Sequence, residues 1–60
     1  QKTYRPQGAT VLTGCDFEDG FIINLDLLTE PIVFDNCTYA GVALAAENLQ
    51  NAPADLVTIQ

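Results

Sequence analysis

Two stretches of this chain follow one pattern, Val11-Leu12-Thr13-Gly14-Cys15-Asp16-Phe17 and, 22 residues later, Val33-Phe34-Asp35-Asn36-Cys37-Thr38-Tyr39. Each copy runs from β-prone residues through a small or polar residue to a cysteine and an aromatic residue. Pro31 and Pro53 recur at the same offset. A repeat of roughly 20 to 50 residues indicates stacked units, each covering the hydrophobic edge of its neighbour.

The residues between and after the two copies are also β-prone. Ala9 to Phe17, Phe21 to Leu25 and Ile32 to Tyr39 favour strands, and Asp55 to Gln60 returns to the same pattern. This last run lacks both the cysteine and the aromatic residue of the repeat. Glu18-Asp19-Gly20 is typical of a turn, because glycine adopts positive φ readily.

Segments 14–20 and 36–41 resemble the recurring small/polar–Cys–polar–aromatic–x–Gly rung of right-handed parallel β-helices. Pectate-lyase-like proteins and many phage, viral and bacterial surface proteins share that fold. The resemblance covers roughly residues 10 to 60 and implies an all-β fold, a parallel β-solenoid segment of about two and a half rungs.

The resemblance also implies that equivalent side chains of successive rungs stack in ladders. Thr13 and Asp35 lie on the same side of the strand as the apolar ladder, so the chain must bend or bulge between them and the cysteines. The ladder residues expected in the core are two aliphatic and two aromatic ones: Val11 above Val33, and Phe17 above Tyr39.

Local propensity favours a second architecture. Val42, Ala45, Ala46 and Leu49 have helical spacing within an alanine-rich segment. A hairpin across Asp19-Gly20, a third strand, one helix at about residues 41–51 and a final strand would then form a small α+β domain.

The chain has room for one domain. Residues 1–8 are polar and contain both basic side chains, Lys2 and Arg5, and we expect them to form an extended arm. Residues 9–60 would form a single small β-rich domain or solenoid segment. With 48% hydrophobic residues, this segment can support a core.

Eight acidic and two basic residues give a formal net charge of −6. Nucleic acids and anionic membrane surfaces are poor partners for such a chain, because both are bound through Lys and Arg. No stretch approaches the roughly 20 apolar residues of a membrane-spanning helix. On charge alone, cationic partners and calcium are compatible with this chain.

Cys15 and Cys37 are the only two cysteines. They form either a disulfide, which favours an oxidising compartment, or two stacked thiols that behave as small hydrophobic groups. Together with the resemblance, they indicate an extracellular, surface or virion-associated location.

The residues for common catalytic chemistry are missing from the sequence. There is no histidine and no glycine-rich phosphate loop, and neither cysteine has a basic neighbour in the sequence. Asp16, Glu18 and Asp19 cluster at the first turn without the spacing of a calcium loop. We therefore expect no enzyme, no cofactor and no metal site.

Two functions follow from these patterns. The first is a non-catalytic structural segment that stacks on other protein chains, copies of itself or a larger parent assembly of the phage, viral or bacterial surface type, and is not a free-standing monomer. The alternative is a small secreted, disulfide-closed module that binds a protein partner, such as an inhibitor or a receptor ligand.

Overall fold

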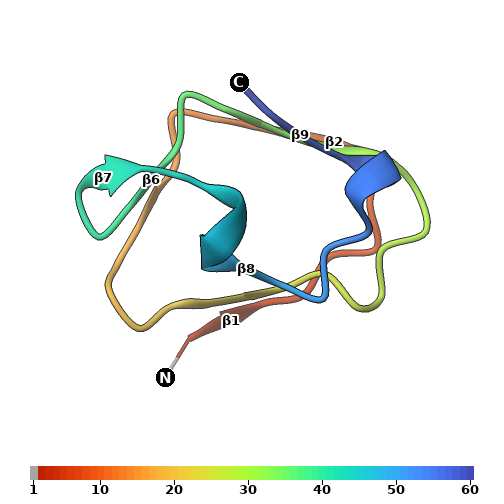
Figure 1. The fold of residues 1–60 in the computed structure, drawn as a ribbon, viewed down its shortest axis with the longest axis horizontal. Coiled ribbons are helices and arrows are strands. Elements are labelled where there is room, and N and C mark those ends of the chain that lie inside the picture. The colour runs from red at the N-terminus through yellow and green to blue at the C-terminus, as the bar shows by residue number, and fades with distance from the viewer. Residues whose placement is uncertain (1) are drawn as a thin grey trace.

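The computed structural model describes residues 2–60 and consists of short strands and two 3-10 helices (Figure 1). The elements in chain order are β1 (Thr3–Tyr4), β2 (Thr10–Thr13), β3 (Asp16–Phe17), β4 (Ile22–Asn24), β5 (Ile32–Asp35), β6 (Thr38–Tyr39), β7 (Val42–Ala43), η1 (Ala46–Asn48), β8 (Leu49–Gln50), η2 (Ala54–Leu56) and β9 (Val57–Ile59). The expected all-β fold is confirmed.

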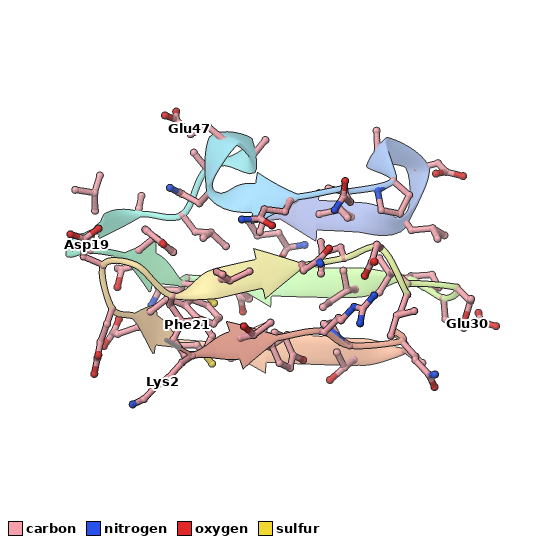
Figure 2. The ribbon with its side chains drawn as sticks, turned by 90° about the horizontal axis from the view of Figure 1, so that it is seen from below. Lys2, Asp19, Phe21, Glu30 and Glu47 are labelled. Atoms are coloured by element: carbon pink, nitrogen blue, oxygen red, sulfur yellow. The ribbon has the colours of Figure 1, made fainter. Side chains whose placement is uncertain are left out.

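The strands form three small sheets, with the orders β1-β4-β8, β2-β5-β9 and β3-β6-β7. Each sheet takes one strand from each pass of the chain around a three-sided circuit (Figure 1). We call β1–β3 the first layer, β4–β6 the second and β7–β9 the third. Figure 2 shows these layers stacked on one another, with the first and third at opposite ends.

The register equals the 22-residue repeat where β2 pairs with β5 and β3 with β6, whereas β1 pairs with β4 at an offset of 19 residues, Thr3 with Ile22. Val11 pairs with Val33 and Phe17 pairs with Tyr39, both between parallel strands. The next step is longer, since Ile32 pairs with Val57. The recurrence of Pro31 and Pro53 is therefore not a structural equivalence, because extra residues enter between the second and third layers.

The bend expected after the paired strands is present in both layers. Gly14 and Asn36 follow β2 and β5 and have φ angles of 66° and 56°. Glycine adopts this left-handed conformation without penalty, and asparagine tolerates it better than most residues. The bend turns the inner face from one sheet to the next.

The α+β alternative is wrong, because residues 41–51 contain no α-helix and only the three-residue 3-10 helix η1. A tight turn at Ala40 and Gly41 joins β6 to β7, and the chain continues through η1 into β8. The hairpin expected across Asp19-Gly20 is also absent, since β3 and β4 lie in different sheets. Burial of Leu44 and strand pairing of Leu49 outweigh the weak helical propensity of the segment.

The core is formed by inward-facing residues of all three sheets. In the second layer Ile23, Ile32 and Phe34 are completely buried. The inward residues in the same columns of the outer layers, such as Leu12 next to Phe34, are partly exposed. The buried residues are Phe17, Ile23, Leu25, Leu28, Ile32, Phe34, Cys37 and Leu44.

The two valines expected in the core ladder are in register but face outward. Val11 is 64% exposed, and Val33 alternates with the buried Ile32 and Phe34. The reason is the two-residue period of a strand, which puts Val33 on the same side as Asp35. Phe17 is buried and its partner Tyr39 is half-buried.

Residues 2–8 belong to the first layer, whereas Gln1 lies outside the described residues. Strand β1 pairs with β4, and the carbonyl of Gln7 accepts a hydrogen bond of 2.8 Å from the amide of Thr29. Gly8 contacts the backbone of Glu30 so closely that a Cβ would overlap the Glu30 carbonyl. The polar arm expected from the sequence is therefore continuous with the rest of the fold.

Candidate functional site

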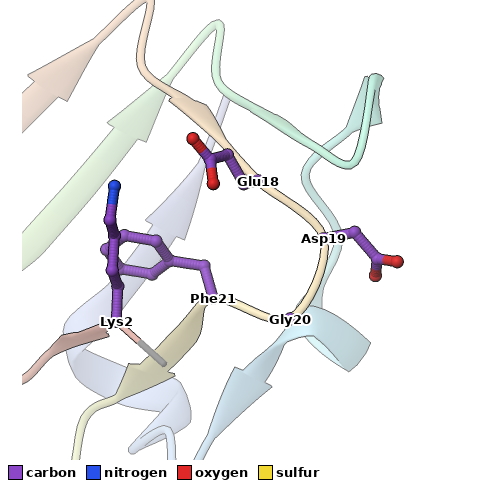
Figure 3. Close-up of a pocket in the computed structure, with 5 residues that line it drawn as sticks. All are labelled: Lys2, Glu18, Asp19, Gly20 and Phe21. Carbon is purple, nitrogen blue, oxygen red and sulfur yellow. The ribbon is translucent and has the colours of Figure 1, made fainter.

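One surface pocket joins the first two layers, and Figure 3 shows the residues that line it. It has a volume of about 450 Å³ and is lined by Lys2, Glu18, Asp19, Gly20 and Phe21. The turn places the two acidic residues here because Gly20 adopts a φ of 86°. Asp19 points away from Lys2 (Figure 3), and no ion pair joins Lys2 to either carboxylate among the described residues.

The ionisable groups of this pocket are one amine and two carboxylates on an open surface. Such groups act together as acids, bases or nucleophiles when they face a common point, but the Asp19 carboxylate points away from Lys2 (Figure 3). No group of three or more metal-ligating side chains occurs within residues 2–60. The acidic cluster that the sequence singles out, Asp16, Glu18 and Asp19, does not converge here, since Asp16 accepts a 2.6 Å hydrogen bond from Thr38.

The two cysteines follow the left-handed residues in successive layers, and both are free thiols. The Cys37 thiol donates to the Leu12 carbonyl at 3.4 Å, and the amide of Thr38 donates to the Cys15 carbonyl at 2.9 Å. Burial raises the pKa of the Cys15 thiol, and the neighbouring Cys37 raises it further. A raised pKa keeps Cys15 protonated at neutral pH, which makes it a poor nucleophile.

Polar side chains link the layers around the outside. Arg5 donates two hydrogen bonds of 2.7 Å to the carboxylate of Asp26, joining the first layer to the second. Asn51 donates to Asn24 at 3.0 Å and so joins the third layer to the second. These contacts fix the layers relative to one another.

The third layer exposes an apolar hollow at its end of the stack. The hollow has a volume of about 290 Å³ and is lined by Ala46, Leu49, Ala52, Ala54, Val57 and Ile59. We call it the third-layer face. Strands β8 and β9 border it as edge strands, so their outer backbone groups pair with no strand among residues 2–60.

The opposite end, which we call the first-layer face, is also incompletely covered. Tyr4, Leu12 and Cys15 pack against the core from this end while staying half-buried. Burial and the nearby Cys15 raise the pKa of Tyr4. Strands β1 and β2 are edge strands here. Both ends of the stack therefore present apolar side chains beside unpaired strand edges.

Comparisons with known proteins supply no relative, since no family model, curated protein or solved structure matches this chain. None of the helices within residues 2–60 is long and apolar enough to span a bilayer. The proposed function therefore rests on the geometry of the chain itself.

The end faces are formed by other residues than those expected in the ladder from the sequence. Phe17 and Tyr39 lie in the sheet β3-β6-β7, away from the third-layer hollow. Leu49 and Ile59 border that hollow and were not singled out by the repeat. The last strand lacks the cysteine and the aromatic residue, so only its alternating apolar residues could have indicated this role.

Proposed function

We propose that this chain is a segment of a parallel β-solenoid and that it acts as a structural module whose ends are covered by further β layers. One observation carries the proposal. Phe34 in the second layer is 0% exposed, whereas Ile59, its register partner in the third layer, is 38% exposed. The same inward column is closed in the middle of the stack and open at its end.

Edge strands and apolar faces favour association with another chain or another layer. An exposed strand edge pairs readily with a further strand, and parallel addition continues the existing sheet. The third-layer face combines such edges with an apolar hollow. A further layer would convert the half-exposed Leu49 and Val57 into residues as buried as Ile23 and Ile32.

The proposal includes a class of assembly and of location. Stacked β layers without catalytic groups suit the body of a surface, viral or phage structure, where the partners are protein chains. The acidic character of the chain, with a net charge of −6, keeps the outward surface soluble while the apolar ends associate.

Sedimentation and thermal unfolding of the purified chain over a hundredfold concentration range test this function. We expect either concentration-dependent association or a poorly folded monomer, because the end layers depend on a neighbour for burial. A folded monomer with a sharp, concentration-independent melting transition would overturn the proposal.

A further inference from the structure

The geometry points to a second copy of this chain as the layer that covers the third-layer face, stacked head to tail through its own first-layer face. This inference rests on the proposed solenoid function and names its partner. The two faces would meet as successive layers of one molecule do, with parallel strands at a spacing of about 4.8 Å.

The columns of inward residues support this stacking on two of the three sides. Tyr4, Ile23 and Leu49 form one column through β1, β4 and β8. Leu12, Phe34 and Ile59 form another through β2, β5 and β9. A second copy in the same register would place its Tyr4 next to Leu49 and its Leu12 next to Ile59, so that apolar residues meet in both columns.

The third side does not continue in the same manner. Strand β7 returns antiparallel to β6 through the tight turn at Ala40 and Gly41. The parallel continuation therefore uses the edges of β8 and β9, which border the apolar hollow.

The charges at the two ends are complementary in this register. Lys2, Phe21 and Glu47 each lie two residues before a member of the Tyr4–Ile23–Leu49 column. Figure 2 shows Lys2 and Glu47 at opposite ends of the stack, toward the same side of the view. Head-to-tail stacking would bring Lys2 of one copy close to Glu47 of the next, a favourable pair of opposite charges.

Other arrangements of two copies are less favourable. Two third-layer faces in contact would bring together Glu47 and Asp55, and that layer contains no basic residue. They would also oppose the strand directions, whereas the sheets at β8 and β9 are parallel. A head-to-tail contact is heterologous, so it leaves a free face at each end and can repeat along a filament.

Reversal of the two charges tests which faces meet. Lys2→Glu and Glu47→Lys are made singly and together, and association is measured by sedimentation at about 0.15 M salt, where screening acts beyond about 8 Å. Each single variant places like charges at the contact, and we expect association to weaken about tenfold. The double variant restores opposite charges and should recover the original association.

Glu30→Lys is the matched control, because it changes the net charge by the same amount as Glu47→Lys. Glu30 is exposed at the side of the stack, away from both end faces (Figure 2). We expect this variant to associate at least as well as the unchanged chain, since it only lowers the overall negative charge.

The outcomes separate this inference from the proposed function. Weakening by both single reversals and recovery in the double variant would support head-to-tail stacking. Association of unchanged strength in the single reversals would overturn head-to-tail stacking. A poorly folded monomer at every concentration would also overturn it. Both results are compatible with the proposed solenoid function. A stably folded monomer would overturn both proposals.

Discussion

Gly14 and Asn36 occupy the same corner of successive layers, directly after the register pair Thr13 and Asp35, and both have a left-handed backbone. Gly14 has no contact within 4 Å of the position of a Cβ, so the corner has room for a side chain. The corner therefore selects residues by backbone conformation and not by space.

This relationship predicts which substitutions at Gly14 and Asn36 the fold tolerates. Asn36→Ala should destabilise the fold by about 1 kcal/mol, because alanine lacks the local hydrogen bonding that helps asparagine adopt positive φ. Gly14→Asn should have a smaller effect than Gly14→Val, since a β-branched residue is strained at φ 66°. Urea unfolding at one fixed protein concentration measures all three variants. Equal stability of Gly14→Asn and Gly14→Val would contradict this explanation.

The alternation along β5 makes a prediction about the core. Phe34→Ala should destabilise the chain by about 3 kcal/mol or more, because it opens a cavity at a completely buried position. Val11→Ala should change stability by less than about 0.5 kcal/mol, since that side chain is 64% exposed. Thermal unfolding followed by circular dichroism compares them. A larger effect at Val11 would restore the core ladder that the sequence suggested.

The tight turn between β6 and β7 can be improved. Ala40 has a φ of 53° and precedes Gly41 at 80°, the combination found in two-residue turns that favour Asn-Gly. Ala40→Asn should stabilise the fold by about 0.5 to 1 kcal/mol, and Ala40→Val should destabilise it. A chemical denaturation series decides the sign. The turn geometry would be wrong if both substitutions acted in the same direction.

The contact of Arg5 with Asp26 gives a pH dependence with a defined sign. Hydrogen bonds from Arg5 lower the pKa of the Asp26 carboxyl, so the folded state favours its charged form. The associated stabilisation is present above the ordinary aspartate pKa of about 3.9 and is lost as the pH falls through the lowered value.

Arg5→Gln should raise the pKa of Asp26 toward its ordinary value, as measured by NMR titration of the carboxyl carbon. Lys2→Gln removes the same amount of charge without contacting Asp26 and should have little effect. An Asp26 pKa that stays low in Arg5→Gln would show that another group stabilises the carboxylate.

The state of the cysteines separates the assembly segment from the secreted module. Both thiols are free in the structure, so excess reductant should leave the far-ultraviolet circular dichroism and the melting temperature unchanged. Thiol titration of the denatured chain should detect both cysteines. Loss of structure on reduction, with no titratable thiol beforehand, would instead favour the disulfide-closed binding module.

Part of the fold could be predicted from the sequence, because the spacing of the repeat equals the spacing of residues that pair between parallel strands. Identical offsets for the cysteines and for Phe17 and Tyr39 correspond to the parallel pairing of β3 with β6. The prediction that Val11 and Val33 face the core is wrong. Thr13 and Asp35 lie on the same side of these strands and indicated that this side faces outward. The period of two fixes which residues share a face but not which face is inside.

The third layer could not be predicted, because local signals there conflict with burial. The segment around Ala45 has helical spacing, yet Ala45 is extended with φ −127° and only η1 follows it. Leu44 is buried and Leu49 continues the column of Ile23, so both depend on contacts between residues far apart in the sequence. The third-layer face depends on the same contacts, and its only local signal is the alternation of apolar residues in the last strand.

The β-rich composition, the 22-residue register of β2 with β5 and of β3 with β6, and the corners at Gly14 and Asn36 can be read from the sequence alone. Each of them depends on residues close in the chain or on a repeated spacing. Which apolar residues are enclosed, and where the stack is left open, depends on how the layers pack in three dimensions. Burial depends on the neighbours above and below, so Phe34 is covered while Ile59 in the same column is left partly exposed.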